Sequence, residues 1–155
     1  MRILRITIAA IAGTSFMTSF SYVMAKMRKK QFKEPELLNK LVSRAGIIKA
    51  SPPKNHITGW LLHYSVGFFF STVYDRIWTK SAVKPNLISG ITLGAISGIL
   101  GIIIWNLTFK IHPNPPKTHL KEFYIQLFFA HLIFGYFAMK GYSLGSTAKR
   151  KLARN

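Results

Sequence analysis

The chain has 155 residues, of which 49% are hydrophobic, and it contains no cysteine. The lack of cysteine excludes a disulfide framework, Cys-ligated zinc, iron–sulfur clusters and thiol catalysis. The formal net charge is +18, from 22 Lys and Arg against 4 Asp and Glu. In a soluble protein this charge would suggest nucleic acid, but the loops of membrane proteins are also rich in Lys and Arg, so we expect no nucleic-acid partner.

Four long apolar runs predict four transmembrane helices, at residues 6–25, 57–78, 86–109 and 121–142. Each run is close to the roughly 20 residues that a helix needs to cross the hydrocarbon core of a bilayer. With their loops the runs use nearly the whole chain, so we expect a single membrane domain over residues 1–155. The predicted fold class is an all-α polytopic membrane protein, a four-transmembrane-helix bundle.

The first run follows Arg2 and Arg5 and ends before Lys26, an arrangement that a secretory signal peptide shares. The run is longer than a usual signal core. Ala9 and Gly13 also stand four residues apart, a spacing at which small residues let two helices approach closely. We therefore expect this helix to remain in the membrane.

The polar segment 26–55 contains a predicted amphipathic helix at residues 35–45, with Leu37 and Leu41 on its apolar face and Lys40 and Arg44 on the other. Such a helix can lie at the membrane surface or pack on the end of the bundle, and the sequence leaves both positions open.

The second run ends in the adjacent charges Asp75 and Arg76. Both side chains are long enough to reach the membrane interface, so we expect boundary residues. Trp60 and Trp78 bracket the same run in the way that aromatic belt residues do.

Small residues recur in the runs at a spacing of four, most clearly in the third, where Gly90, Gly94 and Gly98 form one series and Ser97 and Gly101 form a second pair. Small residues at this spacing permit close helix contact, either inside the bundle or across an oligomer. The predicted packing positions are Ala9, Gly13, Gly67, Gly90, Gly94, Gly98, Gly101 and Gly135.

With four spans, the loops 26–55 and 110–122 share one face of the membrane, and the basic residues after the first run favour placing them in the cytoplasm. The basic segments, including the tail 146–155, predict contact with the lipid bilayer through anionic lipid head groups.

His63 and His131 each begin the pattern His-x-x-x-Gly-aromatic-Phe, inside the second and fourth runs. At about 1.5 Å per residue both lie roughly 10 Å into their helices, so the two imidazoles could reach one level of the bundle. Three interpretations remain open. Each histidine hydrogen-bonds a neighbouring helix without a cofactor; or His63 and His131 bind haem; or His56, His63 and His131 contribute to a site or route for a divalent metal or a proton.

The sequence contains no Gly-rich phosphate loop, no His-Glu-x-x-His and no Gly-x-Ser-x-Gly motif. With only 4 acidic residues, all near predicted interfaces, paired-carboxylate catalysis is also disfavoured. We predict that the chain is not an enzyme.

The segments 11–22 and 34–38, together with Gly59-Trp60-Leu61-Leu62-His63-Tyr64, resemble small, uncharacterised inner-membrane proteins of Bacteroidetes-type bacteria, loosely similar to YagU-like four-span proteins. The resemblance covers most of the chain as a pattern. It implies four helices in a bacterial inner membrane, and it brings no activity, cofactor or catalytic residue.

These observations predict a non-enzymatic integral inner-membrane protein, either an accessory subunit of a larger membrane complex or a self-associating homo-oligomer. The alternative is a haem-binding, metal-binding or small transport protein that uses His63 and His131.

Overall fold

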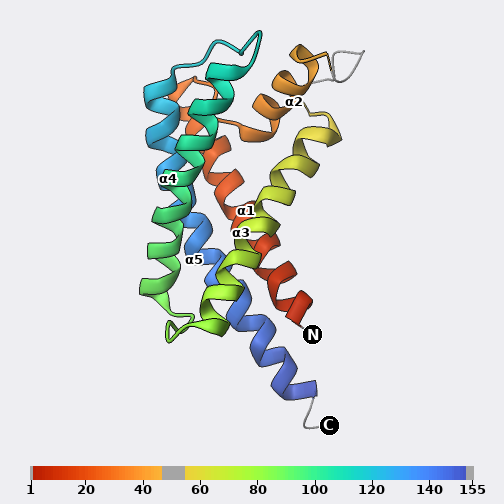
Figure 1. The fold of residues 1–155 in the computed structure, drawn as a ribbon, viewed down its shortest axis with the longest axis vertical. Helices are drawn as coiled ribbons and strands as arrows, with labels where there is room; N and C mark the ends of the chain where they lie inside the picture. The colour runs from red at the N-terminus through yellow and green to blue at the C-terminus, as the bar shows by residue number, and fades with distance from the viewer. Residues whose placement is uncertain (1, 47–54, 153–155) are drawn as a thin grey trace.

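A computed structural model describes residues 2–46 and 55–152, with side chains to residue 146, and this part of the chain is all-α. Its five helices are α1 (Arg2–Arg28), α2 (Glu34–Arg44), α3 (Ile57–Lys80), α4 (Leu87–Ile111) and α5 (Leu120–Leu152). The helices α1 and α4 run in one direction and α3 and α5 in the other, so the start of α1 and the end of α5 lie at one end, and α2 lies at the opposite end (Figure 1).

The prediction of four membrane spans is wrong. Only three helices of the described chain are both long and apolar enough to cross a membrane, over Arg2–Arg28, Leu87–Ile111 and Leu120–Ser146. This is the pattern of a multi-pass membrane protein. The helix α3 is long enough, with 24 residues, but it is not apolar enough. Polar side chains such as His63, Tyr64 and Asp75 interrupt its apolar sequence.

Those polar side chains of α3 face other helices. The Tyr64 hydroxyl and the Ser15 hydroxyl of α1 are hydrogen-bonded at 2.9 Å, and His63 Nε2 and the Thr18 hydroxyl of α1 are also 2.9 Å apart. The run has the length of a membrane span and many Phe and Leu residues, but it also contains the polar side chains through which α3 contacts α1.

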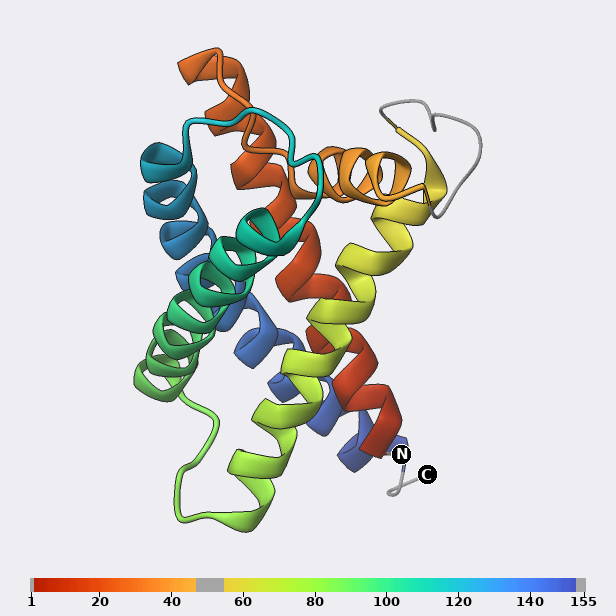
Figure 2. The same ribbon diagram turned by 45° about the horizontal axis from the view of Figure 1, so that its top comes forward.

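The helix α5 lies between α1 and α4 and packs along both, whereas α3 packs on α1 and α2 packs on α3 (Figure 2). The α1–α5 contact is close: the rings of Phe16 and Phe137 stack at 3.6 Å between centroids, and a Cβ on Gly141 would lie 2.8 Å from the Ile8 carbonyl oxygen. Glycine therefore sets the distance between these two backbones.

The outward faces of the helices carry large apolar side chains. On α4 alone they include Ile88, Ile91, Ile96, Ile99, Leu100, Ile103, Ile104, Leu107 and Ile111, all exposed. An exposed apolar patch of this kind is unusual on a soluble monomer and is suited to contact with the hydrocarbon core of a bilayer.

The short helix predicted at 35–45 is α2, and it packs on the end of the bundle. Pro35 occupies its first turn. The Asn39 side chain joins it to the start of α3, because the Gly59 backbone N–H donates to Asn39 Oδ1 at 2.7 Å and Asn39 Nδ2 donates to the His56 carbonyl at 2.9 Å. Gly59 lets the α2 backbone approach, since a Cβ there would collide with the Pro35 carbonyl.

Two residues expected at the membrane boundary are instead buried between the helices. Asp75 is 0% exposed and forms an ion pair with Arg2, and Trp78 is buried with its indole N–H donating to the Ser89 hydroxyl at 3.2 Å. Arg76, by contrast, is exposed as expected. The predicted tail 146–155 continues α5 to Leu152, and its last three residues, 153–155, lie outside the described part of the chain.

Candidate functional site

The structure places His63 and His131 on the same cavity. This cavity has a volume of about 150 Å³, lies in the half of the molecule nearer α2, and receives residues from all five helices. The lining comprises Thr14, Met17, Glu34, Leu38, Leu41, His63, Val66, Gly67, Phe70, Gly101, Ile104, Trp105, Thr108, Leu127, His131 and Phe134. We call it the interhelical cavity.

Each imidazole uses one ring nitrogen in a contact within the protein. His131 Nδ1 lies 2.9 Å from the Leu127 carbonyl, which can only accept, so Nδ1 carries the proton. The Thr18 hydroxyl donates to the Thr14 carbonyl at 2.6 Å, so it accepts from the Nε2–H of His63. In a neutral ring the other nitrogen, Nδ1 of His63 or Nε2 of His131, is then a hydrogen-bond acceptor.

Glu34 is a third titratable residue of the cavity, after His63 and His131, and the sequence analysis missed it. It is 1% exposed, and its Oε1 accepts from the Ser21 hydroxyl at 2.8 Å, while Gln126 Nε2 donates to Ser21 at 2.7 Å. Glu34 Oε2 has no hydrogen-bond partner in the described structure. Burial raises the pKa of the Glu34 carboxyl from 4.5 to about 7, because desolvation penalises the charged form.

A sequence signal for Glu34 did exist. Glu34 stands three, four and seven residues before Leu37, Leu38 and Leu41, so it shares the apolar face of α2. A carboxylate at the start of a helix is also common for electrostatic reasons, so its position in the first turn does not by itself indicate a buried site.

The metal interpretation finds no support in the described residues, which contain no group of three His, Cys, Asp or Glu side chains able to hold a metal ion. His56 lies apart from the other two predicted ligands. It is the N-cap of α3, and its Nδ1 accepts from the Thr58 backbone N–H at 3.3 Å.

Haem does not fit the interhelical cavity. Cofactor pockets typically measure roughly 300–1,000 Å³, against about 150 Å³ here. The space beside Gly101 could have admitted part of a macrocycle, but the His131 ring occupies it. A Cβ on Gly101 would lie 3.0 Å from His131 Cε1.

The other predicted packing residues lie between helices. On α4, Gly90 faces Met139 and the Gly135 carbonyl, Gly94 faces the His131 carbonyl, and Gly98 faces the Cβ of His131. Gly67 lies against Thr14, Gly13 lies against the Phe134 ring, and Ala9 is fully buried beside Gly141. The small residues thus bring the helices of this one chain together.

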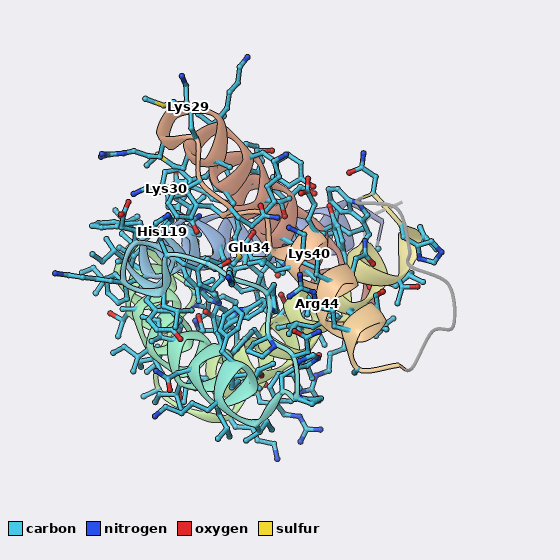
Figure 3. All side chains as sticks on the ribbon, turned by 90° about the horizontal axis from the view of Figure 1, so that it is seen from above. Lys29, Lys30, Glu34, Lys40, Arg44 and His119 are labelled. Carbon is cyan, nitrogen blue, oxygen red and sulfur yellow. The ribbon has the colours of Figure 1, made fainter. Side chains whose placement is uncertain are left out.

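A basic cleft lies outside the interhelical cavity, between the end of α1 and α2. It has an open volume of about 680 Å³ and is lined by Tyr22, Val23, Ala25, Lys26, Lys29, Lys30, Gln31, Lys33, Glu36 and Lys40. Lys30 pairs with Glu122, and Lys33 pairs with Glu36 at 3.0 Å. Figure 3 views this end, where Lys29, Lys30, Lys40 and Arg44 are seen together with Glu34.

Comparisons with protein-family models, curated proteins and solved structures found no match to this chain. The resemblance to YagU-like inner-membrane proteins stays a prediction.

Proposed function

We propose that this chain is a non-enzymatic integral protein of a bacterial inner membrane that acts as an accessory subunit of a larger membrane assembly. The observation that carries the proposal is the division of the helix surfaces. The glycine faces, such as Gly90 and Gly94 on α4, are occupied by α5 of the same chain, whereas large apolar side chains such as Ile99 and Ile103 point outward.

This division favours an accessory subunit over self-association through glycine. Close helix dimers depend on exposed small residues, and here those residues already have an intramolecular partner. The outward apolar faces can contact lipid or the helices of another protein. The basic cleft supports placement of the α2 end against an anionic leaflet, where each Lys or Arg contributes about 1 kcal/mol to attraction.

The test is fractionation of cells that express the tagged full chain at low level, followed by extraction in a mild detergent and native mass determination. We expect the chain in the inner-membrane fraction, at a mass well above that of one copy and with other proteins in fixed ratio. A chain extracted as a monomer would contradict the accessory role, and recovery from another fraction would contradict the location. A mass equal to an integral number of copies would favour a homo-oligomer instead.

A further inference from the structure

The interhelical cavity combines a mostly apolar wall with a few buried polar groups. All five helices contribute to its wall, so it is not a packing gap between two helices. A cavity of about 150 Å³ can hold one molecule of the size of benzene, provided that its walls suit the molecule. Most of the wall is apolar, with the rings of Phe70, Trp105 and Phe134 among its members.

Among the described residues of the wall, the polar members include Thr14 and Thr108 but no Lys or Arg, although the chain carries a net charge of +18. Instead the wall contains the Glu34 carboxyl, whose Oε2 lacks a hydrogen-bond partner in the described structure. It also contains His63 and His131, each with one ring nitrogen left as an acceptor when neutral. The wall is therefore rich in acceptors and carries one acidic group.

A buried carboxyl with one unpartnered oxygen is costly, because Oε2 loses its hydration without a replacement, while Oε1 keeps the Ser21 hydroxyl as a partner. A ligand that brings a cation or a strong donor to Glu34 would supply the missing partner. An anionic ligand would be repelled, and a wholly apolar ligand would leave the carboxyl unpaired. The aromatic rings of the wall can also stabilise a cation through their π faces.

The wall of the cavity reaches the exposed surface of the molecule at α3 and α4. Two of its lining residues, Val66 of α3 and Ile104 of α4, are 49% and 56% exposed. These helices make their main contacts elsewhere, α3 with α1 and α2, and α4 with α5 (Figure 2). A molecule dissolved in the bilayer can therefore approach the cavity from the side.

We infer that the interhelical cavity binds a small lipophilic amine, with its ammonium group at Glu34 and its apolar body toward Phe70 and Phe134. This orientation matches the position of Glu34 on α2, at the end of the molecule, and of Phe70 and Phe134 deeper along α3 and α5. The inference concerns a ligand of this chain alone. It stands whether or not the chain is an accessory subunit.

The test uses the full chain in nanodiscs at pH 8, where the Glu34 carboxyl is mostly ionised. The probes are cyclohexylamine and methylcyclohexane, which have a similar shape but differ in charge. We expect cyclohexylamine to bind with one-to-one stoichiometry. In protein labelled with ¹⁵N-histidine, it should shift the imidazole resonances of His63 and His131 and leave that of the loop residue His119 in place.

The variant Glu34→Gln keeps the shape of the side chain and its acceptor for Ser21, but it removes the charge. We expect it to weaken cyclohexylamine binding by about tenfold or more, as the loss of a charge-assisted hydrogen bond implies, and to leave methylcyclohexane binding unchanged. Glu36→Gln is the matched control on the same helix, because Glu36 pairs with Lys33 and is not part of the cavity wall.

Two results would overturn the inference. The first is cyclohexylamine binding of equal strength in the wild type and in Glu34→Gln. The second needs no variant and is the absence of any shift at His63 and His131 when the wild type is saturated with cyclohexylamine.

Discussion

The Tyr142 hydroxyl of α5 donates a hydrogen bond to Oδ1 of Asp75 on α3 at 2.7 Å, and both side chains are buried. Asp75 Oδ2 is paired with Arg2, so α1, α3 and α5 meet at this carboxylate. The meeting point matters for the architecture, because α3 otherwise contacts α5 through aromatic rings, such as Trp78 on Tyr142, and this is its hydrogen-bonded contact at a charged group. Removal of one partner leaves a buried charge with too few hydrogen bonds.

Tyr142→Phe tests this contact with the loss of a single oxygen atom. We expect the free energy of unfolding to fall by about 2 kcal/mol, the usual contribution of a hydrogen bond to a charged group. The measurement is reversible denaturation in mixed micelles. Tyr136→Phe on the same helix is the control, and an equal effect of the two substitutions would show that the Asp75 contact is not special.

The α4–α5 contact predicts a steric effect at Gly94. A Cβ there would lie 2.5 Å from the His131 carbonyl oxygen, so even Gly94→Ala forces the two backbones apart. We expect a loss of about 1–3 kcal/mol for Gly94→Ala, the usual cost of overpacking, and a larger loss for Gly94→Leu. Thr92→Leu, at an exposed position of α4, is the control. Unchanged stability in Gly94→Leu would mean that α4 does not pack on α5 through this face.

The sequence predicts the helices well because apolar runs and prolines are local features. The run of Leu and Ile in α4, for example, leaves no alternative to a long apolar helix. The same local view fails for α3 and Asp75. The partners of Asp75 stand 73 and 67 residues away, at Arg2 and Tyr142, and no nearby pattern shows that they converge on it.

The sequence predicts only part of the candidate site, because the rest depends on the way the chain turns between helices. His63 and His131 share a repeated pattern and a similar depth, and the structure places both on one cavity. Glu34 completes that cavity only because the chain turns after α1 and brings the first turn of α2 against Ser21. That turn includes Lys29 with a positive φ of 52°, a conformation that is uncommon for lysine and that the sequence does not predict there.

Glu34 predicts a dependence of stability on pH. Its pKa is about 7 in the folded chain and has an ordinary value of 4.5. Below pH 4.5 the carboxyl is protonated in both states and costs nothing, whereas above that pH only the unfolded state gains from ionisation. Stability should therefore fall as the pH rises from 4.5 to 7 and then level off, with a total loss of about 3 kcal/mol.

Glu34→Gln should abolish this loss, because the amide does not ionise and still accepts from Ser21. Denaturation midpoints of the two proteins should agree near pH 4.5, and the variant should be the more stable at pH 8. A constant difference across this range would contradict the raised pKa. Glu36→Gln serves again as the control.

The basic cleft predicts selective retention of anionic lipid. Three of its lysines, Lys26, Lys29 and Lys40, have no ion pair within the described residues, so their charge is available to a phosphate group. The triple substitution of these lysines by Gln should weaken the binding of phosphatidylglycerol by about tenfold or more, since each lysine near a membrane surface contributes about 1 kcal/mol. Native mass spectrometry of protein extracted from mixed phosphatidylglycerol and phosphatidylcholine measures the retained lipid.

The control must remove the same charge from the other end of the molecule. Arg76, Lys80 and Lys84 lie at or after the end of α3, opposite α2 (Figure 1), and their triple substitution by Gln gives an equal change in net charge. If charge alone attracts the lipid, the two triple variants should lose phosphatidylglycerol to the same extent. We expect a larger loss from the Lys26, Lys29 and Lys40 variant, because these three lysines line one cleft and can act together on one phosphate group.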